Sequence, residues 1–421
     1  RAFRTLLWVT LLSATRVARP PSVPGGDGGA ELGDVMRAGI PREPEGETRV
    51  AMVPNVVPKL AKLGFEVVVE KDAGAAAGYD DKSYAAKGAT LGSRTNALGA
   101  DLVIAINVPD FGAMTSGQIL ACVADPFRDT ARINAITETG LTLCSMDMIP
   151  RRLSRAQSMD VNSSQDNLAG YKAVLLGAAA VGRMIPMMMT SAGTVKPAKY
   201  VVMGAGVAGL QAIATAKRLG AVVWASDVRL AAKEQIESLG GKFILVEGME
   251  DFEDESGYAK PLTPDFIQKV NDTVCEVAQD ADVVVTTARL FGRAAPITVP
   301  ASAIETMKTG SVVVDMNTDT GGNCELSKAG QTVIKHGVTI IGEANLPGTV
   351  AHTASLLYAN NLASFVTTLV SDGKLALNLD DEILVGAPEG NDLHVPGMGG
   401  VLVVHDGAIH AAQSRLREAS G

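Results

Sequence analysis

Three glycines in the spacing GxGxxG, Gly204, Gly206 and Gly209, lie between a β-branched run and a helical pattern. In such a turn the first glycine permits a tight bend, the second lets the backbone approach a pyrophosphate, and the third lets the helix pack against the strand. Free N–H groups at the start of the helix attract phosphate charge. The spacing is weak evidence in a chain with 44 glycines, but its place between strand and helix predicts a dinucleotide-binding turn. Its candidate cofactor contacts are Gly204, Ala205, Gly206, Val207 and Gly209.

A carboxylate, Asp227, follows the next predicted strand, about 20 residues beyond Gly204. At this point a carboxylate accepts hydrogen bonds from the adenosine ribose hydroxyls and repels a 2′-phosphate. The pattern therefore favours NAD(H) over NADP(H), and Arg229 weakens that preference slightly. Together with Val228 these two residues are candidate cofactor contacts. The alternative is a domain of this fold that binds no nucleotide.

A polar run over residues 151–165 contains neither glycine nor proline. A linker so dense in Arg, Gln, Asp and Ser is a poor flexible connection, and we expect contacts to order it. In a two-domain dinucleotide enzyme, the connecting segment passes the cleft in which the nicotinamide lies. Spacing alone favours neither a nicotinamide-facing loop nor an N-cap with a solvated helix start at Ser163 or Ser164.

Two series of short β-branched runs alternate with helical patterns, and the polar run joins them. Such alternation predicts parallel sheets with crossover helices. We therefore expect an α/β fold of two Rossmann-like, doubly wound parallel-sheet domains with an interdomain cleft. The predicted strands span 65–69, 102–106, 119–123, 141–145, 200–203, 222–226, 243–246, 283–287, 312–315 and 339–341, and the predicted helices include 54–63, 173–189, 264–277 and 355–369. The predicted domains are 33–165 plus 345–385, 166–344 as the NAD(H)-binding domain, and 386–421 as a tail with a hairpin over 401–410.

The composition agrees with two domains and excludes several classes of protein. A chain of 421 residues, 47% of them hydrophobic, is too long for one compact core. The net charge of −9, without a basic cluster, excludes a nucleic-acid-binding protein. Four scattered cysteines lack CxxC spacing, and all five histidines lie at or beyond His336. We therefore expect buried thiols and no metal site.

Residues 1–32 are expected to be a targeting segment and linker. The segment is rich in arginine and has no acidic residue before Asp27. Its apolar run is far shorter than the ~20 residues that a membrane helix needs. This leaves a mitochondrial-type transit peptide, which we favour, or a short signal sequence. No membrane span is expected elsewhere.

Beyond these local patterns, residues from about 35 to 383 closely resemble the NAD(H)-binding domain I, in the alpha subunit, of proton-translocating NAD(P) transhydrogenase. Alanine dehydrogenase belongs to the same superfamily, but it carries a catalytic lysine in a Val-Lys-Glu-Pro-like segment and a catalytic histidine after the following strand. The matching segments here, 106–109 and 121–126, read Ile-Asn-Val-Pro and Ala-Cys-Val-Ala-Asp-Pro. Because imine chemistry needs such acid/base groups, their absence counts against an amino-acid dehydrogenase. The segments that carry the resemblance are 149–171, 203–209, 227–229, 257–260 and 321–325.

The resemblance implies which residues form the site. The polar loop would hold the dihydronicotinamide through a cluster of Arg, Gln and Asp, with a serine on the carboxamide. A mobile loop with a tyrosine at its tip would close over the bound nucleotide. The implied catalytic residues are Arg152, Gln157, Asp160 and Ser163, and the further cofactor contacts are Gly257, Tyr258, Thr287 and Ala288.

The resemblance also implies an activity and partners. The activity is Si/Re-specific hydride transfer from NADH to NADP+, coupled to proton translocation. The partners are an NADP(H)-binding domain and a proton-conducting membrane domain, on other chains or beyond Gly421, and a second copy in a homodimer. The implied location is the matrix side of the mitochondrial inner membrane or, alternatively, the cytoplasmic face of a bacterial inner membrane.

Two segments depart from the family pattern. Residues 288–296 replace Ala-Leu-Ile-Pro-Gly-Lys-Pro-Ala-Pro, and residues 315–320 replace a segment that begins Asp-Leu-Ala. Both follow predicted strands on the nucleotide side, so the affinity or the loop geometry is expected to differ. The remaining alternatives are an NAD-dependent amino-acid dehydrogenase and a catalytically inactive NAD-binding module.

Overall fold

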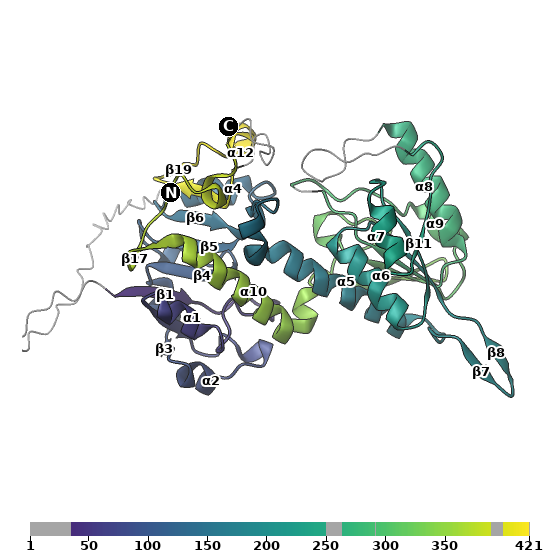
Figure 1. The fold of residues 1–421 in the computed structure, drawn as a ribbon, viewed down its shortest axis with the longest axis horizontal. Coiled ribbons are helices and arrows are strands. Elements are labelled where there is room, and N and C mark those ends of the chain that lie inside the picture. Colours follow the sequence, from purple (N-terminus) through teal and green to yellow (C-terminus); the bar gives the residue numbers. More distant parts are fainter. Residues whose placement is uncertain (1–34, 250–262, 291, 389–398, 421) are drawn as a thin grey trace, which may run out of the picture. The chain divides into compact units, whose positions relative to one another are not determined.

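The computed structural model describes residues 35–249, 263–290, 292–388 and 399–420, and Figure 1 shows their elements. Most strands belong to two large sheets that share one parallel strand order. Crossover helices connect and cover the strands, as expected when parallel strands follow one another. The predicted α/β class with two Rossmann-like sheets is confirmed.

The first sheet has the order β3-β2-β1-β4-β5-β6, and every neighbouring pair is parallel. The first strand, β1, lies in the middle of the sheet, and the order in which strands are added reverses between β1 and β4. Its strands are β1 (Met36–Ile40), β2 (Phe65–Glu70), β3 (Thr90–Gly92), β4 (Leu102–Asn107), β5 (Ile119–Val123) and β6 (Thr142–Ser145). Its helices are α1 (Val57–Lys62), α2 (Asp81–Ala86), α3 (Arg94–Leu98), α4 (Thr130–Thr137) and the returning α10 (Ala351–Val366).

A hairpin near the end of the chain extends this sheet. Strand β18 (Leu402–His405) pairs antiparallel with both β6 and β19 (Ala408–Ile409). Asp406 and Gly407 form its turn with positive φ, which an Asp-Gly pair adopts readily. The hairpin predicted over 401–410 is therefore present, and the sequence did not predict that it joins the first sheet. The short helices α11 (Glu382–Val385) and α12 (Ser414–Ser420) flank it in the chain.

The second sheet has the order β11-β10-β9-β12-β13-β15-β14. All neighbouring pairs are parallel except β14–β15. Its strands are β9 (Lys199–Met203), β10 (Val222–Ser226), β11 (Lys242–Phe243), β12 (Val283–Thr286), β13 (Val312–Asp315), β14 (Gln331–Lys335) and β15 (Val338–Gly342). Its helices are α6 (Val207–Arg218), α7 (Ala232–Ser238), α8 (Pro264–Gln279) and α9 (Ala301–Thr306).

Two predicted elements differ from the structure. The strand predicted over 243–246 spans only Lys242–Phe243 in the structure, at the edge of the second sheet. The helix predicted over 173–189 ends at Ala180, since Gly182 and Pro186 do not favour its continuation. The chain then forms a separate hairpin of β7 (Met188–Thr190) and β8 (Gly193–Val195). A second small hairpin joins β16 (Val370–Ser371) and β17 (Lys374–Leu375).

The long helix α5 (Val161–Ala180) packs directly on the second sheet and its first helix. A Cβ atom added to Gly170 would lie 2.1 Å from the carbonyl oxygen of Ala208 in α6. A Cβ atom on Gly177 would lie 2.6 Å from the side chain of Val283 in β12. Both distances are below any real contact, so this packing requires glycine. Helix α5 thereby fixes the polar segment at its own start relative to α6.

Candidate functional site

The glycine turn lies where the chain leaves β9 and enters α6. Gly204 has φ +98°, which favours glycine, and its N–H donates to the carbonyl of Ser226 at 2.8 Å. A Cβ atom on Gly209 would lie 1.9 Å from the carbonyl oxygen of Gly204, so only glycine lets α6 start this close to the strand. A Cβ atom on Gly206 would meet nothing within 4 Å, which leaves open space beside the first turn of α6.

This turn lies at the point where the strand order of the second sheet reverses. Strand β9 is flanked by β10 on one side and β12 on the other, and both pairs are parallel. The carboxyl ends of all three strands therefore meet at one edge of the sheet. In open α/β sheets, ligands bind at this edge at the strand where the order reverses. Thr287 and Ala288 directly follow β12 at the same edge.

The predicted ribose carboxylate, Asp227, lies against the turn with its side chain 8% exposed, and it is paired with Arg229. One oxygen, Oδ1, accepts the backbone N–H and the Nε–H of Arg229, both at 2.9 Å. The other, Oδ2, accepts the N–H of Ala205 at 2.7 Å and Nη2 of Arg229 at 3.0 Å. A carboxylate offers about four acceptor positions, so these contacts occupy all of them. Val228 lies between the two paired residues and is partly buried.

The polar run folds into a short 3₁₀ helix, Ser154–Met159, followed by the N-cap of α5. The N-cap residue is Asp160, not Ser163 or Ser164: its Oδ1 accepts the backbone N–H of Ser163 at 2.9 Å. Its Oδ2 accepts the Ser163 hydroxyl at 2.6 Å and Nε of Arg151 at 2.9 Å. Arg151 Nη2 also donates to the Ser163 oxygen at 2.7 Å. Three charged or polar side chains thus form one connected cluster.

Two of the four predicted loop residues contact each other, and the other two lie on the segment before α5. Asp160 and Ser163 are in direct contact, whereas Arg152 and Gln157 are exposed on the preceding segment. Sequence reasoning missed Arg151, because two adjacent arginines give no local signal as to which one turns toward the carboxylate.

A second missed residue, Asp166, lies one turn further along α5. Burial raises the pKa of the Asp166 carboxyl, and the charges of Arg289 and Arg151 offset this only partly. The sequence did not indicate that Asp166 is desolvated, because it is one of many polar residues in this run.

The two segments that depart from the family pattern contact each other. Arg289 Nη2 donates to Asp319 Oδ2 at 2.6 Å, and the Asn317 side-chain amide donates to the Ala288 carbonyl at 3.2 Å. Arg128, which follows β5, also donates to the backbone carbonyl of Asp319 at 2.6 Å. The departures therefore supply polar contacts to the loop after β12.

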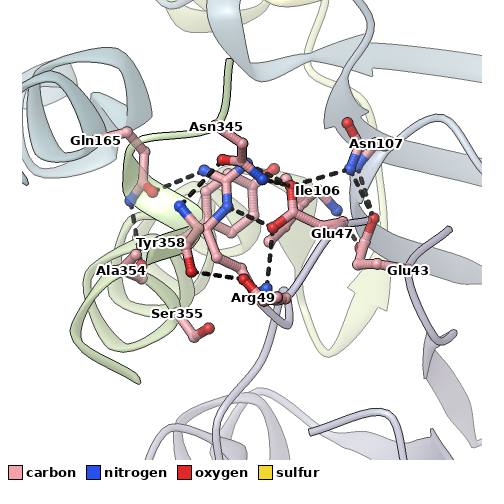
Figure 2. Close-up of polar contacts among 12 residues, drawn as sticks. Glu43, Glu47, Arg49, Ile106, Asn107, Gln165, Asn345, Ala354, Ser355 and Tyr358 are labelled. Atoms are coloured by element: carbon pink, nitrogen blue, oxygen red, sulfur yellow. Dashed lines mark hydrogen bonds and ion pairs between the residues drawn. The ribbon is translucent and has the colours of Figure 1, made fainter. Parts of the chain in front are cut away.

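A different, part-buried polar cluster lies beside the carboxyl ends of β1 and β4 (Figure 2). Glu47 forms a two-pronged ion pair with Arg49, with Nε and Nη2 at 2.8 and 2.6 Å from the carboxylate oxygens. The side chain of Asn107 donates to Glu43 at 3.2 Å and lies 3.4 Å from Glu47. Asn345 donates to Glu47 at 3.2 Å. Every charge in this cluster is thus paired or hydrogen-bonded.

The electrostatics of this cluster do not supply a free acid/base pair. Burial raises the pKa of Glu43, against hydrogen bonds from Ile106 and Asn107 that lower it. Burial would raise the pKa of Glu47, but its hydrogen bonds and ion pair with Arg49 lower it. Asn107 itself neither gains nor loses a proton near neutral pH. Burial raises the pKa of the nearby Cys122 thiol well above its ordinary value, so no thiolate forms there.

Some predictions lie outside the described residues or concern absences. Gly257 and Tyr258 fall in 250–262, outside the described residues. Among the described residues, no group of three or more His, Cys, Asp or Glu could hold a metal ion. None of the described helices is both long and apolar enough to cross a membrane.

Comparisons with known proteins agree with these features. Residues 39–169 match the N-terminal domain of the alanine dehydrogenase/PNT family, and residues 173–395 match its C-terminal domain. The chain is 46% identical to an NAD(P) transhydrogenase subunit alpha protein of Rhodospirillum rubrum, over 83% of this chain and 95% of that protein. A solved transhydrogenase from Sinorhizobium meliloti is 42% identical, with a TM-score of 0.78, over 89% of this chain and all of that one. A solved L-alanine dehydrogenase is 25% identical, with a TM-score of 0.71, over 92% of this chain and all of that one.

Proposed function

Because the chain belongs to the alanine dehydrogenase/PNT family, we propose that it binds NADH at the turn after β9 and presents it as hydride donor to NADP+ on a partner domain. The observation that carries this proposal is a glycine turn at the point where the second sheet reverses, with the polar start of α5 held nearby. When bound, the dinucleotide supplies the hydride, and the chain supplies orientation and charge.

The turn after β9 fits a dinucleotide. Open space lies beside Gly206, and the N–H groups at the start of the 12-residue helix α6 face it. The Asp227 carboxylate lies at the end of the neighbouring strand, where ribose hydroxyls would donate to it. Since Ala205 and Arg229 fill its four acceptor positions, we propose that the Arg229 side chain moves away when a ribose binds.

The start of α5 would hold the nicotinamide. Ser163 is seven residues from Gly170, the point of contact with α6, so the polar cluster lies about 10 Å along the helix from that contact. Direct hydride transfer between two nicotinamides moves no proton, and therefore requires aligned rings rather than a general base. Asp160 fixes Arg151 and Ser163 there, and the exposed side chains of Arg152 and Gln157 would face the ring and the partner.

The partners follow from this role. We propose that an NADP(H)-binding domain accepts the hydride and that a membrane domain couples the transfer to proton movement, with this chain as a homodimer. The two transhydrogenase relatives named above are bacterial, which favours the cytoplasmic face of a bacterial inner membrane over the mitochondrial matrix side.

The test has a binding arm and a transfer arm. NADH, NADPH and NAD+ are titrated against the purified chain by fluorescence, and the chain is then mixed with an NADP(H)-binding domain and followed for transfer from NADH to an NADP+ analogue. Tight NADH binding with transfer supports the proposal. Tight binding without transfer to any compatible domain would replace it with an inactive NAD-binding module, and loss of both would remove the nucleotide site altogether.

A further inference from the structure

A fully buried amide, Asn323, is joined to the residue that follows Thr287 at the nucleotide edge of the second sheet. Its Nδ2 donates to the carbonyl of Ala288 at 2.8 Å and to that of Pro296 at 2.7 Å. One side chain therefore ties together two points of the segment after β12. Because Asn323 has no exposed surface, both of its N–H groups depend on these acceptors.

The carboxylate of Asp315, at the end of β13, holds Asn323 in this orientation. Asp315 is also fully buried, and its Oδ2 accepts the backbone N–H groups of Asn323 and Cys324, each at 2.9 Å. The Ser327 hydroxyl donates to the same oxygen at 2.7 Å. A buried charge is tolerated when its lone pairs are satisfied in this way, and the resulting network is rigid.

This network reaches the glycine turn through Thr287. The Thr287 hydroxyl lies 3.1 Å from the carbonyl oxygens of both Met203 and Gly204, and the Thr287 N–H donates to Met203 at 2.9 Å. A Cβ atom on Gly204 would lie 2.6 Å from the Thr287 hydroxyl oxygen. The backbone at 287–288 therefore sets the position of the turn to which the pyrophosphate would bind.

We propose that Asn323, held by Asp315, is a positioning residue for the nucleotide: it fixes the backbone of Thr287 and Ala288 against the glycine turn. NADH then meets a preformed surface and does not have to order one. This inference rests on the proposed function for its binding consequence, but not for the contacts themselves.

Asn317 adds a contact that the family pattern lacks, since the resembling segment has alanine at this position. Its amide donates to the Ala288 carbonyl at 3.2 Å and to Asn323 Oδ1 at 2.7 Å. It is 4% exposed, so it acts inside the same network. Asn317→Ala therefore removes one of the two amide donors to Ala288 and introduces a residue that the fold accommodates.

Three variants test the proposal. Asn323→Asp keeps the shape but removes both N–H donors, and Asn317→Ala is the milder change. The matched control is Thr318→Val in the same loop, which loses a buried hydrogen bond of 3.2 Å to the Gly342 carbonyl, away from Ala288. We expect Asn317→Ala to weaken NADH binding about threefold and Asn323→Asp about tenfold or more, while Thr318→Val binds as wild type.

Two further readouts separate positioning from a general loss of stability. The KM for NADH in the transfer assay should rise in Asn317→Ala while kcat stays close to wild type. Exchange of the Thr287 amide hydrogen should be faster in Asn317→Ala than in Thr318→Val. Unchanged NADH affinity and unchanged Thr287 exchange in Asn317→Ala would overturn the proposal, even if Asn323→Asp fails to fold. Wild type that does not bind NADH would remove the proposed function, and the exchange measurement would still decide the positioning role.

Discussion

Replacing Asp160 separates two contributions that one carboxylate makes at the start of α5. It caps the helix through the N–H of Ser163, and it holds the charge of Arg151 at 2.9 Å. The proposed function requires the second contribution for hydride transfer, whereas any helix N-terminus benefits from the first. Asp160→Asn should keep the cap, because asparagine caps helices about as well as aspartate, and should lose the ion pair. Asp160→Ala should lose both.

The expected magnitudes follow from these contacts. Loss of the cap costs about 1 kcal/mol, and loss of a charge-assisted hydrogen bond costs about 1.5 kcal/mol for an arginine that is still one-third exposed. Asp160→Ala should therefore lower the free energy of unfolding by about 2 to 3 kcal/mol, and Asp160→Asn by about 1.5 kcal/mol. In both variants transfer from NADH should fall about a hundredfold, as expected when a ring is misplaced by about 1 Å. NADH affinity should change little, since the turn after β9 is intact.

A matched control exists in α2. Asp80 caps that helix through the N–H of Ser83 at 2.8 Å, with the same Asp-x-x-Ser spacing but with no arginine partner among the described residues. Asp80→Ala should leave both NADH binding and transfer unchanged. The assays are urea unfolding, NADH titration and transfer to an NADP+ analogue on the partner domain. Wild-type transfer by Asp160→Asn, with transfer lost only in Asp160→Ala, would reduce Asp160 to a helix cap and refute the role of its carboxylate. Parallel loss of NADH binding and transfer in Asp160→Asn would contradict the separation of binding from transfer.

Three other outcomes are expected. NADH should bind at least tenfold tighter than NADPH, a difference of about 1.4 kcal/mol in binding free energy. Asp227→Ala should reduce this difference and Arg229→Ala should increase it, whereas equal affinities in wild type would contradict the role of Asp227 in cofactor choice. With NAD+ and L-alanine, or with NADH, pyruvate and ammonium, we expect no turnover above background, because Asn107 cannot act as the acid/base group that imine chemistry needs. Sustained NADH formation from L-alanine would favour the amino-acid dehydrogenase interpretation. The pKa of Glu43 is raised above 4.5 in the folded state, so the folded protein binds the proton more tightly than the unfolded chain does. The stability that this proton contributes is present at low pH and is lost as the pH rises. Urea unfolding should therefore show that Glu43→Gln gains stability relative to wild type from pH 4.5 toward neutral. If Glu43→Gln instead loses stability relative to wild type over this pH range, the raised pKa of Glu43 would be contradicted.

The features that the sequence predicted well are those that local chemistry determines. The glycine turn was predictable because its positive φ and its close approach to the strand both exclude a side chain. The start of α8 was predictable because Thr263, Pro264 and Asp265 form a standard helix N-terminus, and the Thr263 hydroxyl does accept the N–H of Phe266. In each case a few adjacent residues carry the whole signal.

The features that the sequence missed depend on contacts between distant segments. Nothing in the pattern over 401–410 indicates that β18 pairs with β6, because a hairpin has the same alternation wherever it docks. Likewise, adjacent arginines at 151 and 152 are equivalent in sequence, and the structure pairs Arg151 with Asp160. The choice between two equivalent residues is made by tertiary structure.

The polar cluster of Figure 2 shows that the absence of a catalytic residue is less informative than the contacts of the residue that takes its place. The sequence has Asn107 in the segment where the resemblance to alanine dehydrogenase implies a lysine, and it does not show which contacts that asparagine makes. In the structure, Asn107 is a donor to Glu43, and Arg49 already has Glu47 as its partner and donates to Gln165 at 2.8 Å. Removing one member would leave a largely desolvated charge unpaired, which costs more than the pair contributes. A lysine introduced at 107 would therefore meet two carboxylates, Glu43 and Glu47, that other residues already engage, so we expect Asn107→Lys alone not to give amino-acid dehydrogenase activity.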